Sequence, residues 1–512
     1  MPSGVDWFSR CVYNPGTNCR ACEIPRRITR KSDFAAARLT ANALSGVRGS
    51  HDALRAHFDN YLNKELEVNH NLRALSAVRI VLAAAAAAVA LSASARADTG
   101  SGPHAIAVGA GSTRSAHPAS GQPVIDWNQV LLSIVNTPGA QPANIQPTRN
   151  FAILHAAIYD AVNSIDRTGQ PYLIDIHAAR HASDVAAADA AAHTALVGLY
   201  PAQQSVLDQD YAAELATVPA GWAKRRGSRI GRRVATRILA IRAADGSNLT
   251  APPFVPRGHP GDYRPTPPTF PTPVFTNWGH VSPFVLARGN QFRPGPPPGP
   301  ASHAYAASLN EVKRLGSSIS TDRTQRQTEI GTFWNAPIQN FWNQIAQTIA
   351  IAHHSNLPAT ARLFAALNLS LADSTIALYD AKYTYQLWRP VTAIHLADTD
   401  GNPQTVADPT WLPLPVNTAA DPSYPGAHST ISAAAAVVLG HFYGDHQRFS
   451  VTSPALPNVI RSFTSFSTAA TEAGLSRIYA GQHFRFDHSA GLRLGHRVAH
   501  FVLRNALVPA AG

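Results

Sequence analysis

The chain has 512 residues, of which 45% are hydrophobic and only 14% are charged. Such a chain can bury a large core, so a mostly disordered protein is excluded. The formal net charge is +12, but the residues after 97 carry only half of it, so nucleic acid is a poor candidate partner.

The first part of the chain carries a segment that is typical of export. Residues 72–98 combine Arg73 and Arg79 with an uncharged apolar run over 80–91 and an Ala-x-Ala triplet that ends at Ala97. This is the layout of a secretory signal peptide, and the apolar run is too short to form a stable membrane span. We therefore predict a signal peptide over residues 68–97 and export to the periplasm or the exterior.

This signal lies in an unusual position, because it begins about 70 residues into the chain. Met1 is the only methionine, so we expect the natural start to be a non-ATG codon near Val68. Residues 1–67 would then be a non-native or untranslated extension. The alternative is a cytoplasmic tail that is followed by a short membrane anchor. All three cysteines fall in this extension, so no disulfide framework is possible after it.

The remaining chain begins with a lead-in and continues as helices. Residues 98–122 are rich in Gly, Ser, Pro and His, which predicts a flexible segment. From Trp127 on, apolar residues recur at spacings of three and four, and alanine-rich stretches add helical propensity. These patterns predict helices around 151–161 and over 184–199, 203–217 and 222–245.

The segment 222–245 also carries a dense run of basic residues between Lys224 and Arg237. A run of this kind on a helix usually forms a face that is exposed to solvent. We interpret it in this way rather than as a binding site.

Residues 251–300 interrupt the helical pattern. They contain 15 of the 39 prolines, which fix φ and remove amide donors, so regular helix or sheet is excluded there. The same segment carries aromatic residues such as Tyr263 and Trp278, which a free linker rarely has. We therefore predict a long ordered loop that lies on the helical body.

Helical periodicity returns after residue 300, whereas strand patterns are scarce and no repeat at a fixed period is visible. The sequence therefore predicts an all-α fold, a helical bundle with a long ordered proline-rich loop, in which residues 123–512 form a single large helical domain. The helices expected in its second half are 302–315, 322–334, 338–354, 358–388, 428–443, 459–473 and 483–505.

Three short segments in the last third of the chain carry the candidate chemistry. In the first, Lys382 and Arg389 are seven residues apart, which is two helical turns, and Pro390 bends or ends the helix. Two cations on one helix face predict an anion site. The alternative is that both side chains face solvent.

The second segment leads into an alanine-rich helix that starts near His428. Gly426 and Ala427 let the backbone come close to a ligand, and the free N–H groups of the helix start can bind an anion. His428 lies where it can exchange a proton with the bound group. The alternative is that Ser429 or Thr430 acts as a plain helix cap.

The third segment contains Arg477, His483 and Asp487. His483 and Asp487 are four residues apart, which on a helix lets the carboxylate reach the ring. An aspartate bonded to one ring nitrogen fixes the tautomer and raises the basicity of the other nitrogen. A histidine nucleophile or metal ligand requires this arrangement. The alternative is a helix-capping ion pair.

In this order the three segments resemble a known signature. Lys-x6-Arg-Pro, then Pro-x-x-His, then Ser-Arg-x5-His-x3-Asp is similar to the signature of the type-2 phosphatidic acid phosphatase and vanadium-dependent haloperoxidase superfamily, over about residues 330–505. The stretches RNFAILHAAIYDAV (149–162) and FWNAPIQNFWNQIA (333–346) look like its bacterial haloperoxidase-related branch.

The resemblance implies a set of oxyanion-binding groups. Lys382, Arg389 and Arg477 would bind the equatorial oxygens of vanadate or phosphate. One departure concerns the middle segment, where the family has Pro-Ser-Gly-His and this chain has Gly426 and Ala427 between the proline and the histidine. The serine hydroxyl that would contact the oxyanion is therefore absent, and the backbone N–H of Gly426 or Ala427 would have to donate instead.

The resemblance also implies three catalytic residues. His483 would be the metal ligand that bonds vanadium in a peroxidase, or the nucleophile that attacks phosphorus in a phosphatase. Asp487 would orient His483. His428 would act as the acid or base on the opposite side of the oxyanion.

Three hypotheses for function follow. The first is a vanadium-dependent haloperoxidase-like enzyme that holds a vanadate cofactor and oxidises halide with peroxide. The second is a periplasmic phosphatase without a cofactor, which hydrolyses phosphate esters through a phosphohistidine at His483. The third is an inactive oxyanion-binding protein. In each, the ligands are small molecules, neither nucleic acid nor a stable membrane span is expected, and the oligomeric state stays open.

Overall fold

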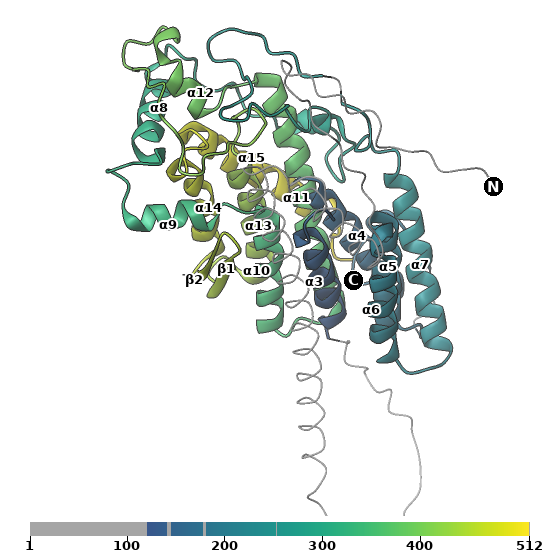
Figure 1. Ribbon diagram of the computed structural model, residues 1–512. Coiled ribbons are helices and arrows are strands. Elements are labelled where there is room, and N and C mark those ends of the chain that lie inside the picture. Colours follow the sequence, from purple (N-terminus) through teal and green to yellow (C-terminus); the bar gives the residue numbers. More distant parts are fainter. Residues whose placement is uncertain (1–119, 141–144, 178–180, 252, 511–512) are drawn as a thin grey trace, which may run out of the picture. The chain divides into compact units, whose positions relative to one another are not determined.

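The computed structural model describes residues 120–140, 145–177, 181–251 and 253–510. The predictions for residues 1–67 and 68–97, and for nearly all of 98–122, lie outside these residues. Across the described ranges the fold is all-α, as predicted, with one two-stranded hairpin (Figure 1). No helix within those ranges is long and apolar enough to cross a membrane.

The helices follow the predicted order. Those before the proline-rich segment are α3 (Gln122–Asn136), α4 (Gln146–Asp166), α5 (Asp184–Leu199), η1 (Pro201–Gln203), α6 (Gln204–Ala216) and α7 (Trp222–Arg242). The later elements are η2 (Trp278–His280), η3 (Gly289–Phe292), α8 (His303–Gly316), α9 (Gln325–Phe333), α10 (Ile338–Ala352), α11 (Leu357–Tyr385), α12 (Pro390–His395), η4 (Ala397–Thr399), α13 (Ala427–Tyr443), β1 (Phe449–Ser453), β2 (Leu456–Phe463), α14 (Phe466–Tyr479) and α15 (Arg485–Asn505).

Within the described residues 251 and 253–300, the proline-rich segment is a loop packed on the helical body, as predicted, and η2 and η3 are its only regular structure. Its Tyr263 and Trp278 are buried. Asp373, which is buried in α11, accepts backbone hydrogen bonds from residues 284–286 at 2.6–2.8 Å. A carboxylate that accepts several amide hydrogen bonds is a strong anchor, and this one ties the loop to the helical body.

The predicted helix over 459–473 is wrong in its first half. β2 ends at Phe463 and pairs antiparallel with β1, in which Phe449 and Val451 are buried and alternate with the exposed Ser450 and Thr452. This alternation is the period of a strand and does not fit a helix. α14 begins only after Ser465, whose hydroxyl accepts from the Thr468 amide at 3.2 Å and caps the helix.

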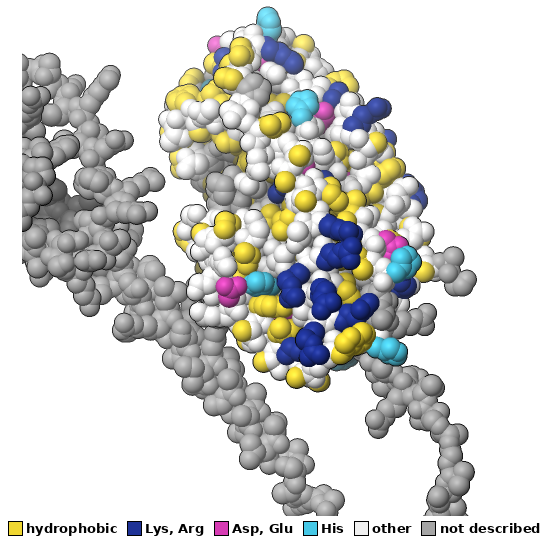
Figure 2. All heavy atoms as spheres, turned by 90° about the vertical axis from the view of Figure 1, so that its right-hand side faces the viewer, with side chains coloured by type: hydrophobic (Ala, Val, Ile, Leu, Met, Phe, Trp, Pro, Cys, Tyr) yellow, Lys and Arg dark blue, Asp and Glu magenta, His cyan; other side chains and the backbone are white. Residues whose placement is uncertain are grey.

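The basic run on α7 is exposed to solvent, as predicted. Arginines gather on the face of the molecule that Figure 2 shows, and the exposed ones on α7 are Arg225, Arg229, Arg232, Arg233 and Arg237. The opposite face of the helix is buried through small and apolar residues such as Gly231 and Val234. The arginines therefore keep one side of α7 in water while the other packs on α5.

The main helices form two groups that are built alike. In the first group α3, α4, α5 and α7 contact one another in series, and in the second α10, α11, α13 and α15 do the same. Contacts between α4 and α11 join the groups.

The same polar contacts recur in both groups. The Trp127 indole on α3 donates to Asp189 on α5 at 3.1 Å, and the Trp342 indole on α10 donates to Ser432 on α13 at 2.8 Å. In the same way Asn128 on α3 bonds His155 on α4, and Asn343 on α10 bonds Asn368 on α11. The spacing between counterparts differs from helix to helix, so no fixed period could show in the sequence.

Glycines set the closest helix contact in each group. On α7 and on α15 two glycines lie four residues apart, and a Cβ on any of them would come within 2.1–2.6 Å of a carbonyl oxygen at the start of the facing helix. The pairs are Gly227 on Ser183, Gly231 on Ala187, Gly491 on Gly426 and Gly495 on Thr430. Only glycine permits this approach, which fixes α15 against the start of α13.

His155 predicts a measurable pH dependence of stability. Burial lowers its pKa to about 3, so the folded chain keeps the ring neutral while the unfolded chain binds a proton below about pH 6.5. Stability is thus lost as the pH falls, by roughly 1.4 kcal/mol per pH unit from this residue.

The substitution His155→Asn copies the Asn343–Asn368 pair and removes the titration. We expect the fall in unfolding free energy between pH 6 and pH 4, measured by urea denaturation, to become shallower by about 1.4 kcal/mol per pH unit. Between pH 7.5 and pH 8.5 the two proteins should show the same slope. An unchanged slope at low pH would contradict this role of His155.

Candidate active site

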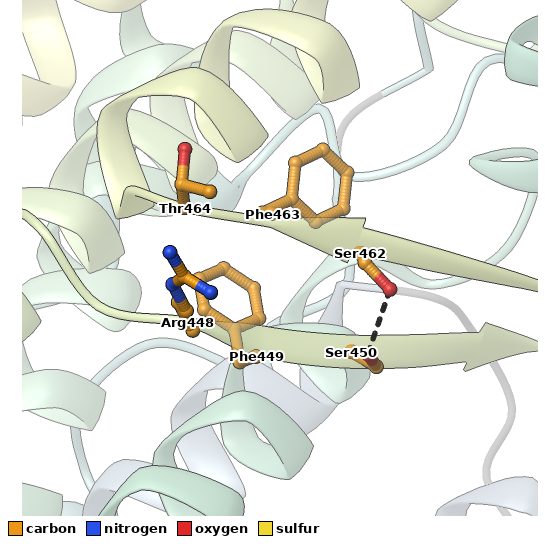
Figure 3. A pocket seen from close by; sticks show the side chains of 6 residues that line it. All are labelled: Arg448, Phe449, Ser450, Ser462, Phe463 and Thr464. Carbon is orange, nitrogen blue, oxygen red and sulfur yellow. Dashed lines mark hydrogen bonds between the residues drawn. The ribbon is translucent and has the colours of Figure 1, made fainter.

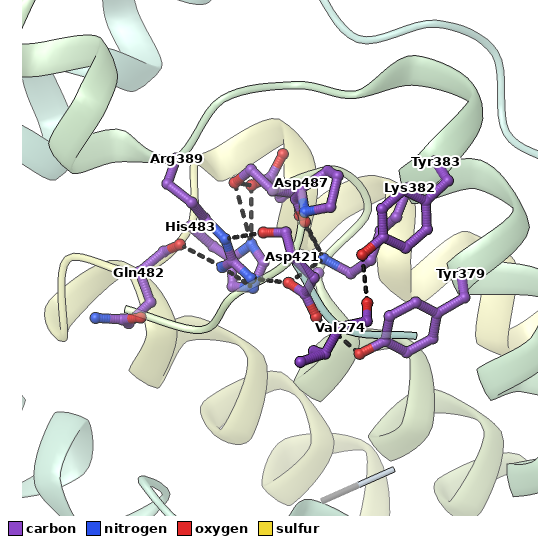
Figure 4. Close-up of polar contacts among 12 residues, drawn as sticks. Val274, Tyr379, Lys382, Tyr383, Arg389, Asp421, Gln482, His483 and Asp487 are labelled. Atoms are coloured by element: carbon purple, nitrogen blue, oxygen red, sulfur yellow. Dashed lines mark hydrogen bonds and ion pairs between the residues drawn. The ribbon is translucent and has the colours of Figure 1, made fainter. Parts of the chain in front are cut away.

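The three segments meet at one buried cluster. It lies where the end of α11, the chain before α12, the start of α13, the end of α14 and the start of α15 converge, and Figure 4 shows its polar contacts. Five of the six main site residues predicted from the sequence are buried, namely Lys382, Arg389, Arg477, His483 and Asp487. His428 is only partly exposed.

Arg389 reaches this cluster by a different route from the one predicted. α11 ends at Tyr385, because Gln386 adopts a left-handed conformation with φ 52°. Arg389 therefore lies beyond the helix and immediately precedes α12, and it does not share a helix face with Lys382. The two cations come together because Asp421 contacts both.

His483 has one ring nitrogen fixed and the other facing a cation. Its Nδ1 lies 2.9 Å from Asp487 Oδ2, and its Nε2 lies 3.2 Å from Arg389 Nη1. Since Arg389 can only donate, Nε2 is the unprotonated nitrogen and Nδ1–H donates to Asp487. The sequence placed this pair on a helix. In the structure His483 precedes α15 and Asp487 lies in its first turn.

Asp487 is held by two further donors. The Ser423 hydroxyl donates to its Oδ2 at 2.5 Å, and the Phe484 amide donates to the same oxygen at 3.0 Å. Burial, opposed by these hydrogen bonds, raises the pKa of Asp487 to about 6. Burial and the positive charges of Arg389 and Lys382 lower the pKa of His483 well below its ordinary value. The ring is therefore neutral at physiological pH.

Arg477 and His428 join the cluster to the chain between α9 and α10. Arg477 Nη1 donates to Asn335 at 2.9 Å, while its buried Nε has no hydrogen-bond partner among the described residues. Burial and the like charge of Arg389 lower the pKa of Arg477 to about 9. His428 Nε2 donates to the Trp334 carbonyl at 2.8 Å.

His428 is suited to only one half of its predicted role. Burial and the nearby Arg477 lower its pKa to about 3, so the ring is neutral near pH 7. With the proton on Nε2, the lone pair is on Nδ1. In this state His428 has no proton to give to a ligand through Nδ1, and its low pKa makes the ring a weak base until a neighbouring anion raises that pKa.

The backbone donors predicted at the start of α13 differ from each other. The Gly426 amide already donates to the Asp487 carbonyl at 3.0 Å. In this structure it is therefore not available to an oxyanion, contrary to the sequence expectation, and Ala427 at the first position of α13 keeps that role as a prediction. Two serines lie near this helix start, but the Ser423 hydroxyl bonds Asp487 and the Ser429 hydroxyl bonds His488, so neither takes the place of the absent serine.

Sequence reasoning missed Asp421, the one carboxylate among the described residues that contacts two of the three cations. Its Oδ1 lies 3.3 Å from Lys382 Nζ and also accepts from Arg389 Nη2. Its Oδ2 accepts from the Tyr379 hydroxyl at 2.7 Å. Burial by itself raises the pKa of Asp421, but Lys382 and Arg389 outweigh it and lower that pKa. The only feature of the sequence that points to Asp421 is its position seven residues before His428, directly before the segment that leads into α13.

Other features of the described chain do not compete with this cluster. A shallow hollow beside the β1–β2 hairpin has no titratable lining residue except Arg448, and its one polar contact drawn in Figure 3 joins Ser450 and Ser462 at 2.8 Å. Among the described residues no group of His, Cys, Asp and Glu has the arrangement of a metal site.

Comparisons with known proteins point to vanadium haloperoxidases. The model of the VCPO second helical-bundle domain matches residues 362–510. Vanadium chloroperoxidase of Curvularia inaequalis is 25% identical over 264 residues, which cover 38% of this chain and 43% of that protein. The chain thus matches less than half the length of this curated relative.

Solved structures match over more of the chain. The crystal structure of a bacterial vanadium-dependent iodoperoxidase shares 26% identity with a TM-score of 0.65, over 78% of this chain and 99% of that one. The holo form of a bacterial vanadium-dependent chloroperoxidase, at 15% identity, has a TM-score of 0.57 over 70% of this chain and 91% of that one, which shows a shared fold.

Proposed function

The chain belongs to the superfamily of vanadium haloperoxidases and type-2 phosphatidic acid phosphatases, and from this premise we propose that it is a vanadium-dependent haloperoxidase that oxidises halide with peroxide. The observation that supports the proposal most strongly is the state of His483. Its Nδ1 is tied to Asp487, and its unprotonated Nε2 lies among cations. A nitrogen in that state is suited to bind vanadium.

The surrounding residues fit a vanadate group. Lys382, Arg389 and Arg477 supply positive charge, and the buried Nε of Arg477 is a donor without an acceptor among the described residues. Fixed cations and donors of this kind stabilise the charge on the oxygens of a tetrahedral oxyanion. Asp421 offsets part of that charge.

Each residue would have a defined part in the reaction. His483 would hold the vanadate through Nε2, while Asp487 and Ser423 keep the Nδ1 proton in place. The cations would orient the oxyanion, and the negative charge of that oxyanion would raise the pKa of His428, so that Nδ1 would accept a proton from an incoming peroxide. Bound vanadate would supply Lewis acidity toward peroxide.

The test compares protein stripped of vanadate with protein to which orthovanadate is restored. The proposal expects halide oxidation that requires both vanadate and peroxide. Release of phosphate from a phosphate ester, inhibited by vanadate, would instead identify a phosphatase that uses the same His483 as nucleophile. Neither activity, together with no binding of vanadate or phosphate by calorimetry, would leave an inactive relative.

The substitution Gly426→Ser tests the departure from the family pattern. A Cβ at Gly426 would lie 3.3 Å from the Asp487 carbonyl oxygen and 3.4 Å from Ser429 Oγ, so a shift of a few tenths of an ångström accommodates it. A hydrogen bond from the new hydroxyl to a charged oxyanion is worth roughly 1.5–3 kcal/mol. We therefore expect the Kd for vanadate to fall by about tenfold or more.

The matched control is Gly426→Ala, which adds the same Cβ without the hydroxyl. It should bind vanadate no more tightly than the unchanged protein. Equal Kd values for the serine and alanine variants would show that residue 426 does not contact the oxyanion.

A further inference from the structure

The carboxylate of Asp421 lies where the proposed function needs the oxygens of vanadate. It is buried, and its Oδ1 contacts both Lys382 and Arg389, which are two of the three cations assigned to the oxyanion. The Tyr379 hydroxyl holds the other carboxylate oxygen at 2.7 Å. Figure 4 shows this carboxylate between the two cations.

The donors of Lys382 are used up by these protein contacts. An ammonium group has three N–H donors. Those of Lys382 meet Asp421 Oδ1 at 3.3 Å, the Pro422 carbonyl, and the Ser423 carbonyl at 3.2 Å. An oxyanion can therefore gain a hydrogen bond from Lys382 only if one of these acceptors gives it up.

Arg389 is nearly as fully engaged. Its guanidinium has five N–H donors. Nε donates to the Asp421 carbonyl at 2.7 Å, and Nη1 donates to the Gln482 carbonyl at 3.0 Å and to His483 Nε2 at 3.2 Å. Nη2 donates to Asp421 Oδ1, so a single N–H remains. Arg477 differs, because its buried Nε has no partner within the described chain.

Of the acceptors on Lys382 and Arg389, the Asp421 side chain is the one that carries a charge and can rotate away. The carbonyl groups belong to the backbone, and His483 is the proposed vanadium ligand. The bond from Tyr379 gives the carboxylate a second support and keeps it on the cations. An incoming oxyanion and the carboxylate have the same sign and need the same donors.

We propose that Asp421 is an internal competitor of the oxyanion and sets its affinity for the site. The inference rests on the proposed function, since the competing ligand is the vanadate or phosphate that the site would bind. Vanadate would bind first through Arg477 and His483 and then displace the Asp421 carboxylate from Lys382 and Arg389. The carboxylate meanwhile satisfies the two buried cations, which would otherwise be costly to bury.

The opposite role makes the opposite prediction. If Asp421 only positioned Arg389 for the oxyanion, its removal would weaken binding. If it competes, removal frees donors on both cations and takes away a repelling charge. The sign of the change in Kd thus separates the two roles.

The experiment measures the Kd of orthovanadate and, separately, of inorganic phosphate by calorimetry for the full chain and its Asp421→Asn variant. We expect both values to fall by about tenfold or more, because like charges a few ångströms apart repel strongly in a buried site. The melting temperature of the variant without ligand should fall, and added vanadate should raise it by more than it raises that of the unchanged protein. A weaker or unchanged affinity would overturn the proposal.

Two further variants guard against a general loss of folding. Tyr379→Phe leaves the charge of Asp421 in place and removes the hydrogen bond that holds it, so binding should tighten a few-fold even if Asp421→Asn does not fold. Asp245→Asn is the matched control. Asp245 is also buried and contacts two arginines, Arg149 at 2.6 Å and Arg242 at 2.9 Å, but it lies beside the first helix group. Its removal should leave both Kd values unchanged.

The outcomes also separate this inference from the proposed function. Tighter phosphate binding in Asp421→Asn without halide oxidation by the unchanged protein would support the competitor and reject the haloperoxidase. Halide oxidation by the unchanged protein, together with weaker vanadate binding in the Asp421→Asn variant, would support the haloperoxidase and reject the competitor role of Asp421. No binding of either anion by any variant would reject both.

Discussion

Replacement of His483 by alanine is expected to abolish halide oxidation, with a loss on the order of 1,000-fold or more, because it removes the only group proposed to bond vanadium. The ring is buried and neutral, and Asp487 Oδ2 keeps bonds from Ser423 and Phe484 after the change. The fold should therefore survive, and circular dichroism and the melting temperature check that it does. The measurement is the vanadate-dependent rate at saturating peroxide.

The control for this substitution is His353→Ala. His353 is exposed and directly follows the last residue of α10, and its Nε2 lies 3.0 Å from Gln447 Oε1. It should retain the full rate. Activity that survives in the His483 variant would show that the site is assigned wrongly, whichever of the two reactions the chain catalyses.

The second large effect is expected from Arg477→Ala. Arg477 is buried and is the cation with the most donor capacity left for a ligand, because only its bond to Asn335 is made within the described chain. Truncation of one partner of a desolvated charge pair costs about 2–5 kcal/mol. The Kd for vanadate should therefore rise by about 30-fold or more.

The stability of the vanadate-free protein should respond differently. Burial and Arg389 both disfavour the charged form of Arg477 and lower its pKa to about 9. Its removal relieves that repulsion, so we expect an unchanged or higher melting temperature without ligand and a smaller increase on adding vanadate. Arg477→Lys keeps the charge and loses the planar fork, so it should give an intermediate Kd. A Kd equal to that of the unchanged protein would exclude Arg477 from the site.

The helices were predictable because their signal is local. Spacings of three and four among apolar residues predicted α4, although that helix is buried on every side, and small residues next to His428 correctly predicted the start of α13. The hairpin was not predictable in the same way. Only one strand alternates clearly, and β2 carries mostly exposed or partly exposed residues, so its pairing depends on β1 rather than on its own sequence.

The site was predictable from residue order and not from geometry. The resemblance named Lys382 and Arg389, yet their assumed common helix face does not exist, because α11 stops at Tyr385. Asp421 joins them across a gap of 32 residues from Arg389. A contact between loops of that separation leaves no periodic trace in a single sequence, so only the folded chain reveals it.

The two matched helix groups differ in how the starts of their corresponding helices, α5 and α13, are capped. At the start of α5 the Ser183 hydroxyl accepts from the Ala186 amide at 3.1 Å, which closes that helix end. At the matching start of α13 stands Gly426, which has no side chain with which to cap. The first group thus has a sealed, stabilised helix end. The start of α13 has no side-chain cap, so the anion that we propose for the cluster would act as one. The first helix group thus stabilises its helix start with a side chain, whereas in the second group a bound anion would neutralise the positive partial charge of the helix start.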